Sequence, residues 1–430
     1  EVDSEKAAAE IAEAGHEVEK TDIEQEELER AAASLEKVAM RLESSIQSGT
    51  MSAESLQNYG MVFEAIIGDA AANPFSIEGK YKAEQEEGEE GEEEGEDGEG
   101  KDREPTDEEV AEVATESLDR IKKLLDTIWK AIKEAVGKSI TFITDFVKKL
   151  FDGAGRLQKQ FAVMQTKIEK ATKDKAEAAD GKVKTPGARN LSFGGSFDEK
   201  ALEAGFKSIE ENALEFADGM AEGAVESFKS IADFYAKGSD DVDSLGNEMN
   251  NTWEGIIKQT NKYVTAELAG GRTLQIVQGT EDKVIKLPSF SIVKHPRAKD
   301  YTGDGEMDVI SLAKLKSLAA AAQKLLAHVQ TKSKVREDLT KARKEAITKG
   351  DGWVKSAREG KLGEKVTEAK ANAVLRLANS NIASNIAVVD RFAYSYVRAM
   401  YGALSAHVAH YGVKVDDAAG EETAAPAADA

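Results

Sequence analysis

The sequence has 430 residues, 32% of them charged, and no cysteine. The lack of cysteine excludes disulfides, thiolate nucleophiles and cysteine-based metal sites. Only 6% of the residues are aromatic and 6 are proline, which favours helices over sheets. We therefore predict a mainly α protein whose core is held by packing alone.

The net charge of −23 is unevenly divided along the chain. Residues 1–116 include 36 acidic and 9 basic residues, whereas the rest of the chain has 44 acidic and 48 basic residues. The first part is therefore repelled by nucleic acid, while the remainder is close to neutral. A solvated acidic tail is the simpler interpretation of the same pattern.

Residues 1–78 are predicted to form an acidic helical arm. Leu35, Val38, Leu42 and Ile46 follow the 3–4 spacing of one helix face, and a second helix is predicted in MSAESLQNYGMVFEAII. Such a hairpin is too small to be stable unless it docks. Residues 79–106 consist largely of Glu and Gly and cannot bury enough apolar surface to fold, so we predict a disordered linker.

Residues 107–415 are predicted to form an elongated multi-helix body, and residues 416–430 a flexible tail. The expected helices cover residues 107–150, 155–178, 198–237, 239–268, 308–349 and 362–412, and a Gly/Pro/Ser-rich loop covers 179–196. Short β-branched runs interrupt the helices near 272–293. Residues 273–277 and 284–287 flank a Gly-Thr-Glu-Asp turn, and residues 289–293 offer a third run, which predicts a small β-hairpin or a three-stranded insertion.

Few residues are placed to carry chemistry. His407 and His410 share a helix face and could hold a metal, but no third ligand is identifiable, and a packed or solvated face is the simpler interpretation. Asp304, Glu306 and Asp308 alternate faintly as in a calcium loop but lack its final Glu, so we predict that Asp308 caps the next helix. We expect no enzyme activity, no metal and no cofactor.

Two basic stretches each allow two interpretations. Residues 118–151 surround an Ile/Leu/Trp/Phe stripe with Lys, which suits either a membrane surface or, as we favour, packing against a protein core or a partner. Residues 332–361 interleave basic and acidic side chains, which indicates a solvated helix with ion pairs rather than a DNA-binding face. The longest uncharged run, residues 399–413, is too short and too polar to span a membrane, so a membrane partner is not expected.

The junction NPFSIEG, residues 73–79, has the features of a proteolytic site. Ser76-Ile77-Glu78-Gly79 follows Pro74 at the end of the helical arm and precedes the Glu/Gly run, where a protease can bind extended backbone. A second segment of the same kind, Ala114-Thr115-Glu116-Ser117, lies just beyond that run but inside a predicted helix. The small-x-Glu pattern occurs elsewhere by chance, and position distinguishes these two.

Four segments in this order carry a resemblance to a known family. They are SGTMSAESLQNYGMVFEAIIG in the acidic arm, the PFSIE junction, RIKKLLDTIWKAIKEAVGKSITFITDFVKKLFDGAGRLQKQ, and RTLQIVQGTEDKVIKLPSFSIV before the C-terminal helices. The arrangement resembles the internal head proteins of giant phages similar to phiKZ. The long Glu/Gly run departs from the expected pattern of that family.

The resemblance implies a helical structural protein, assembled in the host cytoplasm and packed inside the phage capsid. A prohead protease would cut after Glu78 or Glu116, other capsid-interior proteins would be neighbours, and the body would be able to lie beside packaged DNA or be ejected with it. Two alternatives are a membrane-active helical protein masked by its arm, and a scaffold protein that forms stable oligomers and is not cut.

Overall fold

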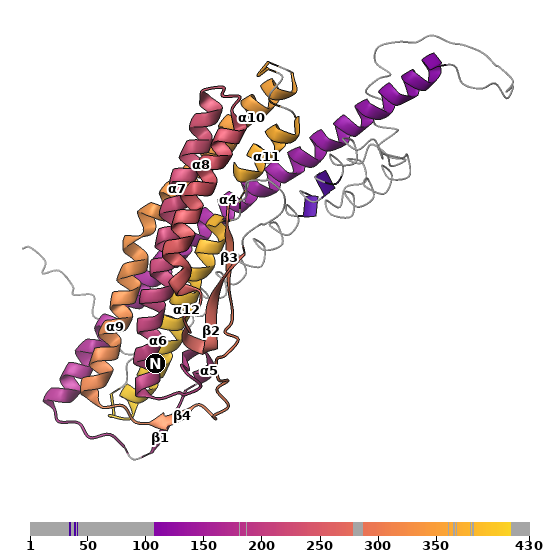
Figure 1. Cartoon of the computed structure of the whole chain (residues 1–430). Helices are drawn as coiled ribbons and strands as arrows, with labels where there is room; N and C mark the ends of the chain where they lie inside the picture. The colour runs from indigo at the N-terminus through magenta and orange to yellow at the C-terminus, as the bar shows by residue number, and fades with distance from the viewer. Residues whose placement is uncertain are drawn as a thin grey trace, which may run out of the picture. The chain divides into compact units, whose positions relative to one another are not determined.

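Long helices make up most of the structure, a computed structural model of the chain (Figure 1). The described residues are Ser34, Leu35, Val38, Ala39 and Arg41, and residues 107–179, 181–185, 187–277, 287–359, 361–363, 366, 368–378, 380 and 382–413. The chain divides into two compact units, one made of residues 23–141 and the other of residues 1–22 and 142–430. The predicted mainly α fold is confirmed.

In the first unit, several apolar side chains are buried. Leu35 and Val38, from the predicted stripe of the arm, are 2% and 6% exposed. Helix α4 (Asp107–Lys173) begins in this unit, and its Ile128, Ile132 and Ile140 are buried as well. Their burial agrees with core packing, the interpretation favoured for residues 118–151.

Helix α4 does not end at residue 150, as the sequence predicted, but continues through residues 151–155 to Lys173. One of the two glycines in this stretch serves close packing. A Cβ atom added at Gly153 would lie 2.8 Å from Oη of Tyr394, so this glycine allows the Tyr394 side chain to approach the helix backbone. A Cβ atom added at Gly155 would lie 3.4 Å from Nε2 of Gln330, which is an ordinary contact.

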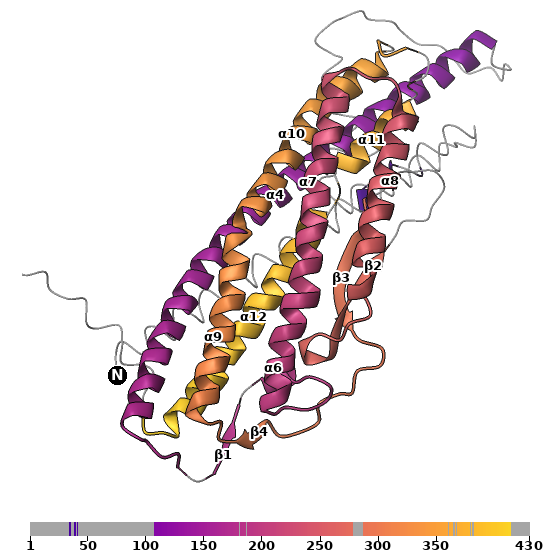
Figure 2. The same cartoon turned by 60° about the vertical axis from the view of Figure 1, so that its left-hand side comes forward.

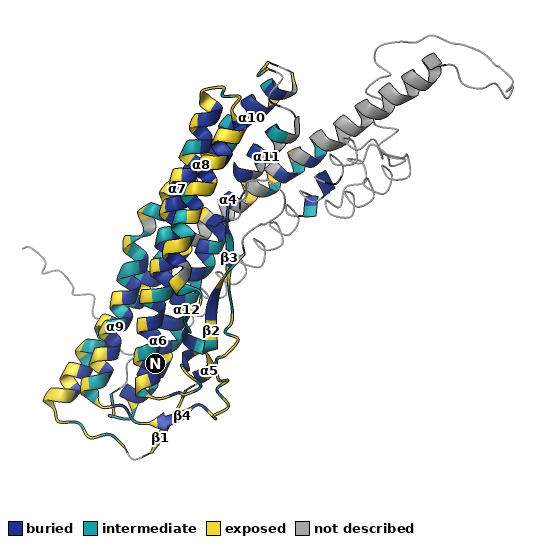
Figure 3. Ribbon diagram, in the orientation of Figure 1, coloured by how far each residue is buried: buried dark blue, intermediate teal, exposed yellow. Residues whose placement is uncertain are grey.

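The second unit is a bundle of long helices (Figure 2). Its remaining helical elements are α5 (Ala188–Leu191), α6 (Glu199–Ser208), the π-helix η2 (Ile209–Leu214), α7 (Glu215–Ala236), α8 (Val242–Thr260), the 3₁₀ helices η3 (Asn261–Tyr263) and η4 (Ala269–Gly271), α9 (Leu312–Thr331), α10 (Ser333–Arg358), α11 (Glu368–Ala378) and α12 (Ile382–Ala409). Helix α7 packs against α8, α10 and α12, and α12 also packs against α9. Figure 3 shows buried residues along the inward faces of these helices.

Two of the predicted long helices are broken. The helix expected over 308–349 is divided into α9 and α10 at Lys332, the residue between them. The helix expected over 362–412 is divided into α11 and α12, and Ser380 between them is not helical. The backbone N–H of Ile382 donates to the Ser380 hydroxyl at 3.4 Å, so a short polar side chain competes with the helical hydrogen bonds there.

The predicted β insertion is an antiparallel pair. Strand β2 (Arg272–Val277) pairs with β3 (Ser289–Lys294), with Arg272 opposite Lys294 and Val277 opposite Ser289. The first predicted run therefore pairs with the third. The middle run, residues 284–287, lies outside the described residues except for Leu287, which is buried and not in a strand.

A second antiparallel pair was not predicted. Strand β1 (Lys182–Lys184) lies in the expected loop over 179–196 and pairs with β4 (Glu306–Asp308). The register places Lys182 opposite Asp308 and Lys184 opposite Glu306, so opposite charges face each other across the pair. The prediction that Asp308 caps a helix was wrong, because Asp308 ends a strand and Ser311 stands at the N-cap of α9.

Substituting Gly205 with alanine is expected to destabilise the fold by about 1–2 kcal/mol. The new Cβ would collide with the hydroxyl of Tyr396, which donates a hydrogen bond to the Leu202 carbonyl at 3.0 Å and cannot move freely. Overpacking costs about 1–3 kcal/mol, offset by up to about 1 kcal/mol of helix propensity. Urea unfolding measures the difference.

Gly352→Ala is the matched control for Gly205→Ala. Gly352 is exposed in the interior of α10, and no atom lies within 4 Å of an added Cβ. This variant should be stabilised by about 0.5–1 kcal/mol. Stabilisation of both variants would contradict a tight α6–α12 contact.

Candidate functional site

A cluster of charged side chains lies in the interior of the second unit. Arg336 donates from Nε and Nη2 to the two carboxylate oxygens of Asp390 at 2.8 and 3.0 Å, and from Nη2 to Asp218 at 3.1 Å. His328 Nε2 donates to Asp218 at 2.9 Å, and Nζ of Lys332 lies 3.4 Å from the same carboxylate. These five residues form what we call the Arg336 cluster.

Helix geometry brings the Arg336 cluster together. His328, Lys332 and Arg336 follow each other at intervals of four residues and so share one face, even though α9 gives way to α10 at Lys332. Asp218 comes from α7, four residues after the π-helix η2, and Asp390 comes from α12. The cluster thus ties α7 and α12 to the junction between α9 and α10.

The acidic and the basic side chains of the cluster are each stabilised in their charged form by their partners. Burial raises the pKa of Asp218. The hydrogen bond from His328 and the charges of Arg336 and Lys332 lower this pKa by more than burial raises it, so the pKa lies below its ordinary value. Burial lowers the pKa of Arg336, and Asp390 and Asp218 raise it by more. Buried charges persist when they are paired in this way. The arrangement is a structural connection, with one buried guanidinium nitrogen, Nη1 of Arg336, lacking a hydrogen-bond partner.

The two C-terminal histidines have different environments. His407 is fully buried, and its Nδ1 accepts a hydrogen bond from the backbone N–H of Ile310 at 3.2 Å, whereas His410 is only partly buried. Tyr411 donates to the carbonyl of Ile310 at 3.0 Å, so α12 and the residues after it hold both backbone groups of Ile310. Burial, with the nearby His410, lowers the pKa of His407 to about 4. The packed-face interpretation of His407 is confirmed.

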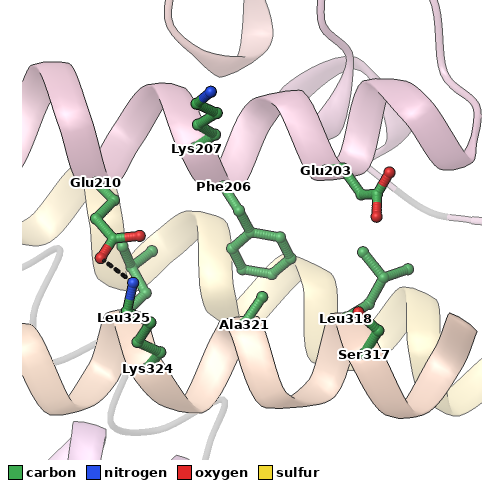
Figure 4. A pocket seen from close by; sticks show the side chains of 9 residues that line it. All are labelled: Glu203, Phe206, Lys207, Glu210, Ser317, Leu318, Ala321, Lys324 and Leu325. Atoms are coloured by element: carbon green, nitrogen blue, oxygen red, sulfur yellow. Dashed lines mark ion pairs between the residues drawn. The ribbon is translucent and has the colours of Figure 1, made fainter.

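A shallow groove of about 250 Å³ runs between α6 and α9 (Figure 4). Its floor includes Phe206 and Leu318, and Glu203 and Lys207 stand at its edge. Glu210 and Lys324 form an ion pair of 2.7 Å beside it. Its charges are of mixed sign and it holds no cluster of reactive groups.

Neither a metal site nor a membrane span is found in the part of the chain that the structure describes. No group of three or more His, Cys, Asp or Glu side chains among these residues is placed to hold a metal ion. No helix there combines the length and the apolar character needed to cross a bilayer.

Comparison with protein families decides the identity of the chain. The family model for phiKZ-like phage internal head proteins matches residues 102–407, from just before α4 to the last turn of α12. The chain belongs to this family. Searches of characterised proteins and of solved structures found no match. The resemblance drawn from the sequence is confirmed.

As an internal head protein, the chain is a structural component of a phage particle, located inside the capsid. The matched region covers the whole Arg336 cluster and both strand pairs, β1–β4 and β2–β3. The acidic arm and most of the Glu/Gly run precede it.

The predicted cleavage residues fall in two places. Ser76, Ile77, Glu78 and Gly79 lie outside the described residues. Ala114, Thr115, Glu116 and Ser117 lie within α4, in its third helical turn. A protease that binds extended backbone would meet helix at the second site.

Sequence reasoning missed the Arg336 cluster. Arg336 lies in the stretch 332–361, which was predicted to be a solvated helix, yet Arg336 is 3% exposed and Arg343 is fully buried. One signal was available for Asp390, because it is the one acidic residue of α12 and directly follows the uncharged run IASNIAVV, residues 382–389. A lone carboxylate on an apolar helix predicts a buried partner.

Proposed function

We propose that this internal head protein is a non-enzymatic packing component whose acidic arm is removed during capsid maturation, so that the remaining body lies against packaged DNA. The observation that carries the proposal is the division of charge. Residues 1–116 have a net charge of −27, and the remainder of the chain has a net charge of +4. Removing all of residues 1–116 converts a chain that DNA repels into one that it tolerates, and removing residues 1–78 alone accomplishes about half of this change in charge.

The two candidate cleavage sites differ in how much of the acidic sequence they remove. Cutting after Glu78 removes 18 acidic and 5 basic residues and leaves the Glu/Gly run on the body. Cutting after Glu116 removes the whole acidic segment but requires the first turns of α4 to unwind. We therefore expect the cut after Glu78 to come first.

Mass spectrometry of N-terminal peptides from mature particles tests this proposal. A terminus at Gly79 or Ser117 is expected. Glu78→Gln should abolish the terminus at Gly79 and leave longer chains in the particle, because the residue before the cut is changed. An arm that stays attached in mature particles would overturn the proposal.

Glu36→Gln is the matched control for this experiment. Glu36 ends another Ser-x-Glu segment, Ser34-Leu35-Glu36, whose Leu35 is buried in a helix. This substitution should leave processing unchanged. If Glu36→Gln blocked processing as strongly as Glu78→Gln, the position of the cut would have to be reassigned.

A further inference from the structure

We propose that one exposed face of α4, between residues 148 and 173, is the surface that contacts packaged duplex DNA. The proposal rests on the DNA association proposed above and states which surface of the protein makes the contact. Six exposed cations lie on this segment: Lys148, Lys149, Arg156, Lys159, Lys170 and Lys173. Its exposed anions are Asp152 and Glu169, and Glu169 pairs with Lys316 of α9 at 2.7 Å. We call this surface the α4 basic stripe.

Helical spacing aligns the α4 basic stripe. Lys148, Lys159 and Lys170 are spaced eleven residues apart. This spacing is about three helical turns, so the three side chains share one side of the helix. From Lys148 to Lys173 the helix rises about 37 Å at about 1.5 Å per residue. Lys148, Arg156, Lys159 and Lys170 have no ion-pair partner within 4 Å among the described residues. Their charges are therefore available to a partner outside the chain.

Two other exposed surfaces of the second unit have a different charge. Between residues 215 and 260, on α7, α8 and the turn that joins them, nine acidic and three basic residues are exposed. On α10, exposed Lys and exposed acidic residues alternate. Figure 2 shows the lower part of α4 along one edge of the bundle and α8 along the opposite edge. A polyanion would be attracted to the α4 edge and repelled from the α8 edge.

Duplex DNA fits the α4 basic stripe better than the acidic segment of the chain itself. DNA presents one negative charge per about 1.7 Å of its axis along a stiff rod, so a straight line of cations over about 37 Å can meet phosphates without deforming either partner. The Glu/Gly run of residues 79–106, which its composition predicts to be disordered, would have to lose chain entropy to follow the same line, and its glycines would contribute no side-chain contact. We therefore assign the stripe to DNA.

Lysine acetylation followed by mass spectrometry tests this assignment in the full chain. The reaction is run with and without a 30-base-pair duplex at low salt, and again with a full chain whose Glu residues between 84 and 99 are changed to Gln. In the chain with the changed Glu residues, DNA should slow acetylation of Lys148, Lys159, Lys170 and Lys173 about threefold or more, and in the unchanged chain by less, because its acidic segment repels DNA. Lys334, Lys341, Lys344 and Lys355 on α10 should be unaffected.

The outcomes separate the two proposals. Protection of lysines elsewhere would overturn the α4 assignment and leave DNA association standing. No protection of any lysine in either chain would overturn both. If the stripe is slow to react without DNA and becomes reactive when the Glu residues are changed to Gln, its occupant is the chain's own acidic segment, and the assignment to DNA is wrong.

Two variants with four substitutions each, both made in the chain whose Glu residues between 84 and 99 are changed to Gln, give an independent measurement. Lys148→Gln, Arg156→Gln, Lys159→Gln and Lys170→Gln together should weaken duplex binding about tenfold or more at 50 mM salt. They should also lower the slope of log affinity against log salt by about 3–4, because each lost phosphate contact contributes about 0.9. The control changes Lys334, Lys341, Lys344 and Lys355 to Gln and should alter neither quantity. Equal losses in both would indicate a general charge effect and overturn the assignment.

Discussion

Replacing Arg336 with leucine is expected to lower the free energy of unfolding by about 3–5 kcal/mol. Leucine removes the two hydrogen bonds to Asp390 and the bond to Asp218, and leaves Asp390, 3% exposed, with a buried unpaired charge. Asp218 retains His328 and Lys332, so most of the loss comes from Asp390. Urea unfolding followed by circular dichroism measures the change.

Two further variants test the cause of this loss. Arg336→Leu combined with Asp390→Leu should lose less stability than Arg336→Leu alone, because the unpaired carboxylate is gone. Lys341→Leu, at an exposed position of the same helix, should change stability by no more than about 0.5 kcal/mol. If the double variant lost more stability than Arg336→Leu alone, or if Arg336→Leu had normal stability, the cluster would not hold the helices together.

Much of the fold could be predicted from periodicity, because long amphipathic helices repeat a local pattern. The apolar stripe of α4 and the β-branched runs near residue 272 were both visible. The β1–β4 pair could not be predicted in this way. Each strand has three residues, too few to show alternation, and the partners are more than 120 residues apart in the chain. Its pairing depends on the tertiary structure and on complementary charges.

The internal charges were harder to predict than the helices that hold them. A sequence with 32% charged residues gives each Arg many exposed partners, so Arg336 resembles its solvated neighbours until the helices are placed. The same difficulty applies to the α4 basic stripe. Its cations are spaced by helical turns and separated in sequence by neutral and acidic residues, and only burial on the other faces shows that they share one exposed side. Family membership, by contrast, followed from the order of segments along the chain.

Acid is expected to destabilise the protein through His407. In the unfolded chain this imidazole takes up a proton near pH 6.5, whereas burial, with His410 nearby, lowers its pKa in the folded state to about 4. Between these values the unfolded state binds more protons, so stability falls as the pH falls from about 6.5 to 4. The slope from this one group is at most about 1.4 kcal/mol per pH unit, and the total at most about 3 kcal/mol. Urea unfolding at a series of pH values between 4.5 and 7.5 measures it.

His407→Gln separates this effect from other titrating groups. The Gln amide oxygen can still accept from the backbone N–H of Ile310, but the side chain no longer titrates, so the pH dependence in this range should become shallower by about 1 kcal/mol per unit. His410→Gln is the neighbouring control and should retain most of the slope, because burial is the larger cause of the low pKa. A wild-type slope in His407→Gln would mean that the His407 ring binds a proton as readily in the folded state as in the unfolded one. The hydrogen bond from Ile310 to Nδ1 would then be lost in acid, and the link between α12 and the residues before α9 would have to be made by Tyr411 alone.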